Sequence, residues 1–171
     1  MYTFDSGSWS QKGSDIDGEA ATDLSGSSVS LSANGNIVAI GAPGDDDGGS
    51  NAGNVKVYKW NGSSWAQLGG DIDGDNAGDA LGEESSIALS ADGHIIAVGS
   101  KLYNSNQGYV KVLKYNGSSW NQLGSNINGN AGGDNFGISV SINAAGNIIA
   151  ASADNTDGMG YTKLYQFDGI I

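Results

Sequence analysis

Short hydrophobic runs of two kinds follow one another along the chain and recur three times. The first kind alternates apolar residues with Ser or Ala, which is typical of a strand with one small-residue face. Its copies are Ser27–Ser32, Ser85–Ser90 and Ile138–Asn143. The second kind is apolar throughout and favours a strand covered on both faces. Its copies are Asn36–Gly41, His94–Gly99 and Asn147–Ser152. Asn34-Gly35 and Asp92-Gly93 lie between the two kinds in the first two copies and favour a tight hairpin.

Two further strands are expected in each copy. The third strand has mixed faces, and its copies are Val55–Trp60, Val110–Tyr115 and Thr162–Phe167. An Asn-Gly turn and a segment that begins with Ser-Trp follow it, at Ser64–Gly69 and Ser119–Gly124; the remaining copy of this segment is Ser8–Gly13. Consecutive hairpins in this order predict a four-stranded antiparallel meander, and no segment has helical periodicity.

The whole chain is therefore organised as three repeats. Trp9, Trp65 and Trp120 mark them at spacings of 56 and 55 residues. We place the repeats at approximately 14–69, 70–124 and 125–169 of a single domain over residues 1–171, with residues 8–13 supplying the fourth strand of the last repeat. Four-stranded meanders at this spacing predict an all-β fold, a β-propeller with three blades per chain. A β-solenoid is the main alternative, but its repeats are usually much shorter.

The last repeat is divided between the two ends of the chain. Three blades are fewer than the roughly four to eight that close a ring. We therefore expect a homodimer that forms one six-bladed propeller, in which each N-terminal strand completes the last blade of the partner. The alternative is that the sequence is a fragment or an engineered piece of a longer six- or seven-bladed chain.

The repeats resemble FG-GAP repeats, the blades of integrin-type propellers. The motif residues are Phe136-Gly137 before a first strand and Gly41-Ala42-Pro43 after a second strand. The other copies are degenerate, with Leu81-Gly82, Ser25-Gly26, Gly99-Ser100-Lys101 and Ser152-Ala153 at these places. The resemblance implies a location outside the cell or on its surface. It also implies calcium in the loop between the first two strands, but that loop is here only Ala33–Asn36 and its equivalents, so this site is not carried over.

Composition and charge narrow the possible partners. The chain has 29 Gly, one Pro and no Cys, and its net charge is −12. The acidic charge argues against nucleic acid and against anionic membrane surfaces. The first residues lack the pattern of a signal peptide, and no apolar run is long enough to span a bilayer, so we expect a soluble chain.

Acidic residues recur after each fourth strand and form the first candidate for chemistry. Their copies are Asp15, Asp17, Glu19 and Asp23; Asp71, Asp73, Asp75 and Asp79; and Asn126, Asn128, Asn130 and Asp134. Alternating oxygen ligands suit calcium. The replacement of Asp by Asn in the third copy favours a structural role instead, in which these side chains bond nearby backbone amides in turns. Asp45-Asp46-Asp47 is a second acidic group without an equivalent in the second repeat, and we interpret it as a solvated loop. No metal ligand or cofactor is assigned, and calcium remains the alternative.

Repeated aromatic residues are the other candidates. Trp9, Trp65 and Trp120 lie on fourth strands, and Phe4, Trp60, Tyr115 and Phe167 at the ends of third strands. Packing between blades is the favoured interpretation, and glycan binding is the alternative. Tyr103 is a better candidate for ligand contact because it lies alone in a loop.

No catalytic residue is assigned. His94 is the only histidine, and no serine lies in a nucleophile motif, so we expect no enzymatic activity. The function expected is a non-enzymatic binding module whose ligand is a protein or a glycan. A propeller lectin and a structural fragment without a ligand are the alternatives.

Overall fold

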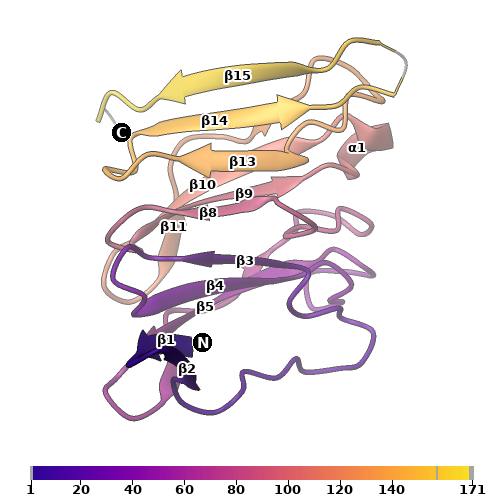
Figure 1. Cartoon of the computed structure of the whole chain (residues 1–171). Helices are drawn as coiled ribbons and strands as arrows, with labels where there is room; N and C mark the ends of the chain where they lie inside the picture. Colours follow the sequence, from indigo (N-terminus) through magenta and orange to yellow (C-terminus); the bar gives the residue numbers. More distant parts are fainter. Residues whose placement is uncertain (1, 157, 170–171) are drawn as a thin grey trace.

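A computed structural model describes residues 2–156 and 158–169, and these residues form four antiparallel sheets (Figure 1). The N-terminal hairpin pairs β1 (Tyr2–Asp5) with β2 (Ser8–Gln11). The first sheet has the order β3 (Ser28–Leu31), β4 (Ile37–Ala42), β5 (Asn54–Trp60) and β6 (Trp65–Gln67), and β7 (Ile72–Asp73) also pairs with β5.

The second sheet repeats this arrangement and the third repeats most of it. The second sheet contains β8 (Ile87–Leu89), β9 (Ile95–Ser100), β10 (Tyr109–Tyr115) and β11 (Trp120–Gln122), with β12 (Ile127–Asn128) pairing with β10. A single helical turn, α1 (Tyr103–Asn106), connects β9 to β10. The third sheet contains β13 (Ser139–Ile142), β14 (Ile148–Ala153) and β15 (Tyr161–Gln166).

These strands confirm the predicted all-β meander, but the sequence analysis missed four short elements. They are β1, β7, β12 and α1. β7 and β12 are only two residues long, so hydrophobic periodicity could not reveal them. The predicted fourth strand of the third sheet lies instead in the N-terminal hairpin, where Trp9 of β2 pairs with Phe4 of β1.

The three larger sheets stack face to face, and each contact between sheets contains a hydrophobic core (Figure 1). One core joins Val55 and Val57 of the first sheet to Ile96 and Val98 of the second. The other joins Val110 of the second sheet to Phe136, Val140 and neighbouring residues of the third. Each sheet thus has a leading face, which contacts the next sheet along the chain, and a trailing face, which contacts the preceding one.

The inner strands approach closely because glycine allows it. A side chain on Gly99 would overlap the carbonyl oxygen of Gly137 in the next sheet, and one on Gly41 would overlap that of Gly82. Backbone hydrogen bonds also pass from sheet to sheet: Ala33 N donates to Ala91 O (2.9 Å), and Ala91 N donates to Ala144 O (3.0 Å). These three alanines occupy equivalent positions in the three repeats, so the same backbone hydrogen bond forms between the first and second sheets and between the second and third.

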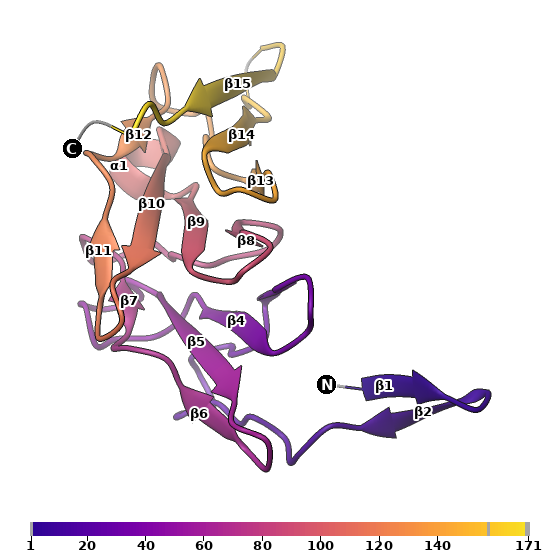
Figure 2. The ribbon, with the colours of Figure 1, turned by 90° about the vertical axis from the view of Figure 1, so that its left-hand side faces the viewer.

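The N-terminal hairpin extends away from the stacked sheets (Figure 2). The segment that follows it, residues 12–19, returns along the trailing face of the first sheet, where Ile16 lines a groove together with Val29 and Ile40. No helix within residues 2–156 and 158–169 is long and apolar enough to cross a membrane.

Candidate functional site

The first sheet differs from the other two at one position, where the second and third sheets each have a tyrosine. In the second sheet, the buried Tyr109 hydroxyl donates to Asp79 Oδ2 (3.0 Å) and accepts from Asp75 N (3.3 Å). In the third sheet, the Tyr161 hydroxyl donates to Asp134 Oδ2 (2.6 Å) and accepts from Asn130 N (3.1 Å). Each phenol therefore ties a strand to the acidic loop that precedes its own sheet.

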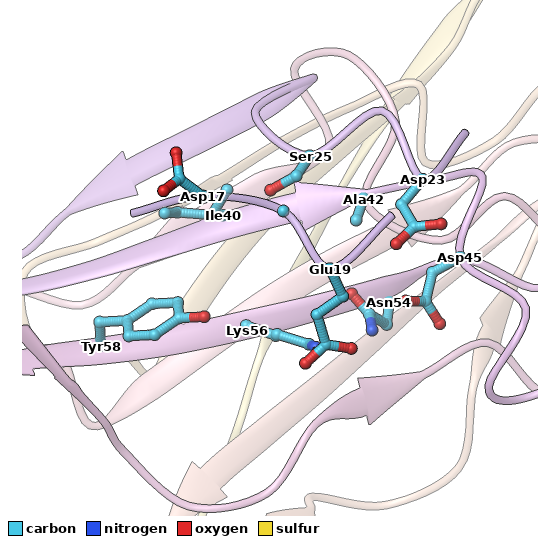
Figure 3. A pocket seen from close by; sticks show the side chains of 11 residues that line it. Asp17, Glu19, Asp23, Ser25, Ile40, Ala42, Asp45, Asn54, Lys56 and Tyr58 are labelled. Atoms are coloured by element: carbon cyan, nitrogen blue, oxygen red, sulfur yellow. The ribbon is translucent and has the colours of Figure 1, made fainter. Parts of the chain in front are cut away.

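In the first sheet the equivalent residue is Asn54, whose side chain is too short to reach that loop. Ser25 is also smaller than its equivalents Leu81 and Phe136, and Ala42, like Ala153 of the third sheet, is smaller than Ser100 of the second. A polar cavity of about 20 Å³ lies here, lined by Asn54, Ser25 and Ala42 and by charged side chains (Figure 3). A cavity of this size holds a single water molecule or ion.

Asn54 is fully buried, yet neither polar atom of its side chain has a hydrogen-bond partner among the described residues. A buried polar group without a partner costs about 1–3 kcal/mol. In Figure 3 the Asn54 amide lies between the carboxylates of Glu19 and Asp45. The sequence analysis missed this residue, although the signal was present: Asn stands where the other two repeats have Tyr.

The lining of the cavity is strongly acidic. Lys56 Nζ lies 2.6 Å from Glu19 Oε1 and 3.5 Å from Asp71 Oδ2. Burial raises the pKa of the Asp45 carboxyl, and the nearby Asp47 and Asp23 carboxylates raise it further, against the lowering effect of the hydrogen bond from Asp47 N. One ammonium group therefore faces several carboxylates.

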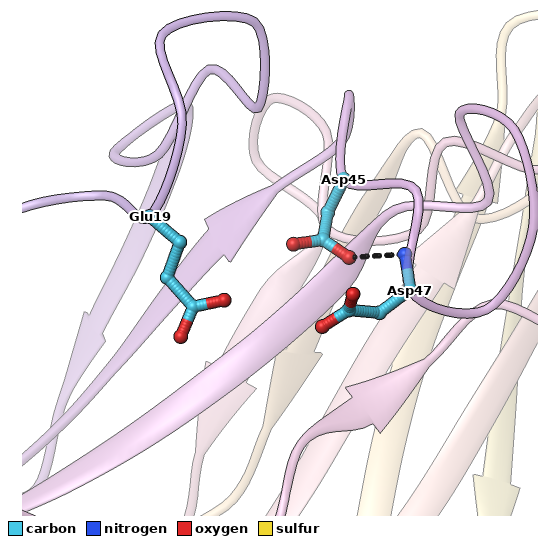
Figure 4. Close-up of side chains that lie close together, drawn as sticks. All are labelled: Glu19, Asp45 and Asp47. Atoms are coloured by element: carbon cyan, nitrogen blue, oxygen red, sulfur yellow. Dashed lines mark hydrogen bonds between the residues drawn. The ribbon is translucent and has the colours of Figure 1, made fainter.

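Glu19, Asp45 and Asp47 form a cluster beside this cavity (Figure 4). One ligand atom from each can be chosen such that all three lie within 4.8 Å of one another. Asp45 Oδ1 accepts a hydrogen bond from Asp47 N (2.9 Å), which shapes the loop. The cluster joins one acid of the repeated run to two acids of the Asp45–Asp47 loop, two groups that the sequence analysis had treated separately.

Several other acids of the repeated run bond backbone amides or a lysine, as the turn interpretation predicts, whereas Asp73 Oδ1 is buried without a hydrogen-bond partner among the described residues. Asp79 Oδ2 accepts from Asp75 N and Asn76 N, and Asp134 Oδ2 accepts from Asn130 N and Ala131 N. Asp75 Oδ1 pairs with Lys111 Nζ (2.6 Å). In the described part of the second and third sheets, these carboxylates do not converge on one point.

Two of the repeated tryptophans pack between neighbouring units, as the favoured interpretation predicts. Trp120 Nε1 donates to Leu68 O (2.7 Å) across the contact of the first and second sheets. Trp65 Nε1 donates in the same way to Lys12 O (2.8 Å), and Lys12 is equivalent to Leu68. Residues 8–13 thus occupy the position of a fourth strand in a unit that precedes the first sheet.

Trp9, Tyr103 and His94 have different surroundings. Trp9 is 68% exposed, lies tilted against Phe4 with ring centroids 5.2 Å apart, and lines the groove on the trailing face of the first sheet. Tyr103 packs edge-on against Tyr109 beside the core, which weakens its candidacy as a ligand contact. His94 Nδ1 lies 3.6 Å from Asp92 Oδ2 at a turn, and its ring stacks on Tyr115.

Two apolar faces remain exposed at the ends of the stack. On the trailing face of the first sheet, Val29 is 63% and Leu31 51% exposed, whereas the equivalent Ile87 and Leu89 of the second sheet are 6% and 8% exposed. These residues line a groove of about 550 Å³. On the leading face of the third sheet, Leu164 is also exposed, although the equivalent Val57 of the first sheet is fully buried.

Comparison with known proteins identifies the class of fold. Residues 14–58 match the family model described as FG-GAP repeat, which confirms the resemblance for this part of the chain. Among solved structures, the chain is similar to TolB from Acinetobacter baumannii, with 9% sequence identity and a TM-score of 0.50. The match covers 83% of this chain and 30% of that one, and it concerns the fold alone.

No curated protein sequence matches. The chain therefore has a fold of the β-propeller type.

Proposed function

We propose that the chain is a non-enzymatic interaction module whose main partner is a second copy of itself, with which it forms a six-bladed propeller. The observation that carries this proposal is the exposure of Val29 and Leu31 at positions that are buried in the second sheet. Burying such side chains contributes roughly 25 cal/mol per Å² of apolar surface. The leading face of the third sheet carries Ile148 and Leu164, the equivalents of the residues that cover Ile87 and Leu89.

The N-terminal hairpin supplies a second argument. In the proposed dimer, β2 exchanges its partner β1 for β15 of the second copy, and Phe167 of that copy takes the place of Phe4 beside Trp9. A cavity of about 190 Å³ between the second and third sheets is lined by Leu123, Ile127 and Phe167. Leu123 is equivalent to Leu68, the acceptor of the Trp120 indole. In the proposed dimer, Trp9 of the second copy would enter this cavity and donate its indole N–H to Leu123 O.

The series of backbone hydrogen bonds through Ala33, Ala91 and Ala144 supports the same closure. Among the described residues the series ends with Ala144 N at one end and Ala33 O at the other. A two-fold axis would join each Ala144 N to Ala33 O of the second copy, which closes the series into a ring of six. These contacts of the proposed interface thus have counterparts inside the chain.

One position departs from this pattern. Ser152 stands where Gly41 and Gly99 lie against the next sheet. Its side chain would meet Gly26 of the second copy, so the closing contact must be wider here than the two contacts within the chain.

The solution mass tests this proposal. For a dimer of the 17.3 kDa chain, light scattering should give a mass of 2 × 17.3 = 34.6 kDa. Val29→Asp places a charge on the exposed trailing face, where the free chain tolerates it, and should give a folded monomer. Trp9→Ala should weaken the dimer as well. Leu102→Ser, an exposed apolar residue between β9 and β10, is the matched control and should remain dimeric. A folded wild-type monomer at micromolar concentration would overturn the proposal.

Glycan binding is the second candidate, and the exposed Phe4–Trp9 pair favours it. Two aromatic faces on a projecting hairpin offer a stacking surface for a sugar ring. The two functions make opposite demands on Trp9, since a dimer interface buries it and a lectin site keeps it open. Binding on a glycan array that is lost in Trp9→Ala, with an unchanged monomeric mass, would favour the lectin. The family resemblance favours a location outside the cell for either function.

A further inference from the structure

We propose that the first sheet binds one divalent cation of the calcium type between Glu19, Asp45 and Asp47, with Asn54 Oδ1 as a further ligand. Calcium binds oxygen ligands at about 2.3–2.6 Å, so two ligand oxygens on opposite sides of the ion lie roughly 5 Å apart. The three carboxylates already meet this condition, with mutual distances within 4.8 Å (Figure 4). Glu19 and Asp47 are exposed and can adjust around the ion.

The buried Asn54 side chain is independent support for a ligand at this place. Both of its polar atoms lack a partner among the described residues, although the residue is fully buried. The cavity in front of it is lined by Glu19 and Asp45 (Figure 3). A cation held by these carboxylates would take the amide oxygen as a ligand, and the amide N–H groups could donate to a carboxylate or to a water molecule on the ion.

The local charge fits a divalent ion. The three carboxylates of the cluster and the Lys56 ammonium give −3 + 1 = −2 at the proposed site, and Asp17 and Asp23, which also line the cavity, add further negative charge. Lys56 contacts Glu19 Oε1, and Asp47 N donates to Asp45 Oδ1. Glu19 Oε2 and Asp45 Oδ2 have no hydrogen-bond donor or ion-pair partner among the described residues and are available to the ion.

The same place in the other two sheets is closed to a cation. The hydroxyls of Tyr109 and Tyr161 bond the acidic loop there, and Lys163 Nζ contacts the neutral Asn130 Oδ1 (2.6 Å). The proposed site is therefore single in each chain. Its Asp45 and Asp47 lie in the loop between the second and third strands, and Glu19 precedes the first strand, so the site differs from the loop where the family resemblance implies calcium.

Isothermal titration of the chelator-treated chain with CaCl₂ tests the proposal, with MgCl₂ at equal ionic strength for comparison. We expect one calcium ion per chain and a dissociation constant in the range of about 10⁻⁴–10⁻³ M that is typical of extracellular modules. Calcium should also raise the melting temperature, because it binds the folded state. No heat of binding and no shift in melting temperature would overturn the proposal, and three ions per chain would point to the repeated acidic run instead.

Two pairs of variants locate the site. Asp47→Asn should weaken calcium binding at least tenfold. Asp46→Asn is the matched control, because Asp46 is adjacent and exposed but bonds only Asn51 N (2.7 Å), and it should change the affinity less than twofold. Asn54→Tyr restores the residue of the other two sheets and should abolish calcium binding while the chain stays folded. Equal effects of Asp46→Asn and Asp47→Asn, or retained binding in a folded Asn54→Tyr chain, would contradict the assignment.

Discussion

A single side chain determines whether each sheet holds a closed polar contact or an open cavity. Tyr109 and Tyr161 reach the acidic loop, and Asn54 does not. The acidic loops themselves were visible in the sequence, and so was their repetition. The cavity was not predicted, because the comparison of the repeats concerned the acidic residues that they share. It did not consider that the first repeat has smaller side chains, Ser25 and Asn54, where the others have Leu or Phe and Tyr.

At this scale the Tyr161–Asp134 contact has a pH dependence that can be measured. The Tyr161 hydroxyl lowers the pKa of the Asp134 carboxyl, and hydrogen bonds from Ala131 N and Asn130 N lower it further. A lowered folded-state pKa stabilises the fold above the unfolded value of about 3.9, and this contribution is lost as the pH falls through the folded value. Tyr161→Phe should therefore destabilise the chain by a constant amount between about pH 5 and 7, and by less below about pH 4.

Urea unfolding of wild type and Tyr161→Phe between pH 2 and 7 measures this difference. Tyr165→Phe is the matched control on the same strand, because burial alone raises the pKa of the Tyr165 hydroxyl, with no contribution from a hydrogen bond among the described residues. The effect of Tyr165→Phe on the free energy of unfolding should be the same at every pH between 2 and 7. A Tyr161→Phe difference that grows on acidification would contradict the assignment of the lowered pKa.

At the scale of elements, the repeat comparison predicted the strands well. Alternation, continuous apolar runs and Asn-Gly turns are local signals, and they placed β3–β6, β8–β11 and β13–β15 within about two residues. The missed elements depend on contacts elsewhere. β7 and β12 exist because Ile72 and Ile127 pair with Val55 and Val110, and α1 contains left-handed residues, Asn104 and Ser105, that no helical period could indicate.

The spacing of the sheets depends on glycine in the second strand of the first two meanders, at Gly41 and Gly99. Gly99→Ala would push a methyl group into the carbonyl of Gly137, and the backbone on the other side cannot rotate away as a side chain could. Overpacking of this kind costs about 1–3 kcal/mol or more. We expect Gly99→Ala to lower the free energy of unfolding by about 3 kcal/mol in urea titrations. Ser152→Ala, at the equivalent position of the third sheet, should change it by less than about 1 kcal/mol, and equal effects would show that the close approach does not limit the spacing.

At the scale of the whole molecule, the stack has two unlike ends, and each exposes apolar residues. Two kinds of contact between neighbouring units each occur twice in the chain. They are the hydrogen bonds from the Trp65 and Trp120 indoles and the backbone hydrogen bonds of the Ala33–Ala91–Ala144 series. The sequence predicted the divided third unit from the positions of the repeats alone. The sequence could not predict that the trailing face of the first sheet and the leading face of the third are exposed. Both faces of a fully covered strand carry apolar residues, so the sequence pattern does not distinguish them.

Ser152 offers the sharpest test of how the two ends would meet. In the proposed dimer its side chain approaches the backbone near Gly26 of the second copy, where the chain itself uses Gly41 against Gly82 and Gly99 against Gly137. Ser152→Gly should therefore tighten the dimer about tenfold, since the removal of an overlap worth about 1.4 kcal/mol changes an affinity by that factor. The same change should lower the stability of the separated chain by roughly 0.5–1 kcal/mol, because glycine in a strand loses more conformational freedom on folding. Analytical ultracentrifugation measures the first effect, and urea unfolding at a concentration below the dissociation constant measures the second. A gain in dimer affinity together with a loss of stability of the separated chain is expected only if Ser152 faces the interface. A Ser152→Gly chain that loses stability without gaining affinity would place Ser152 outside the interface.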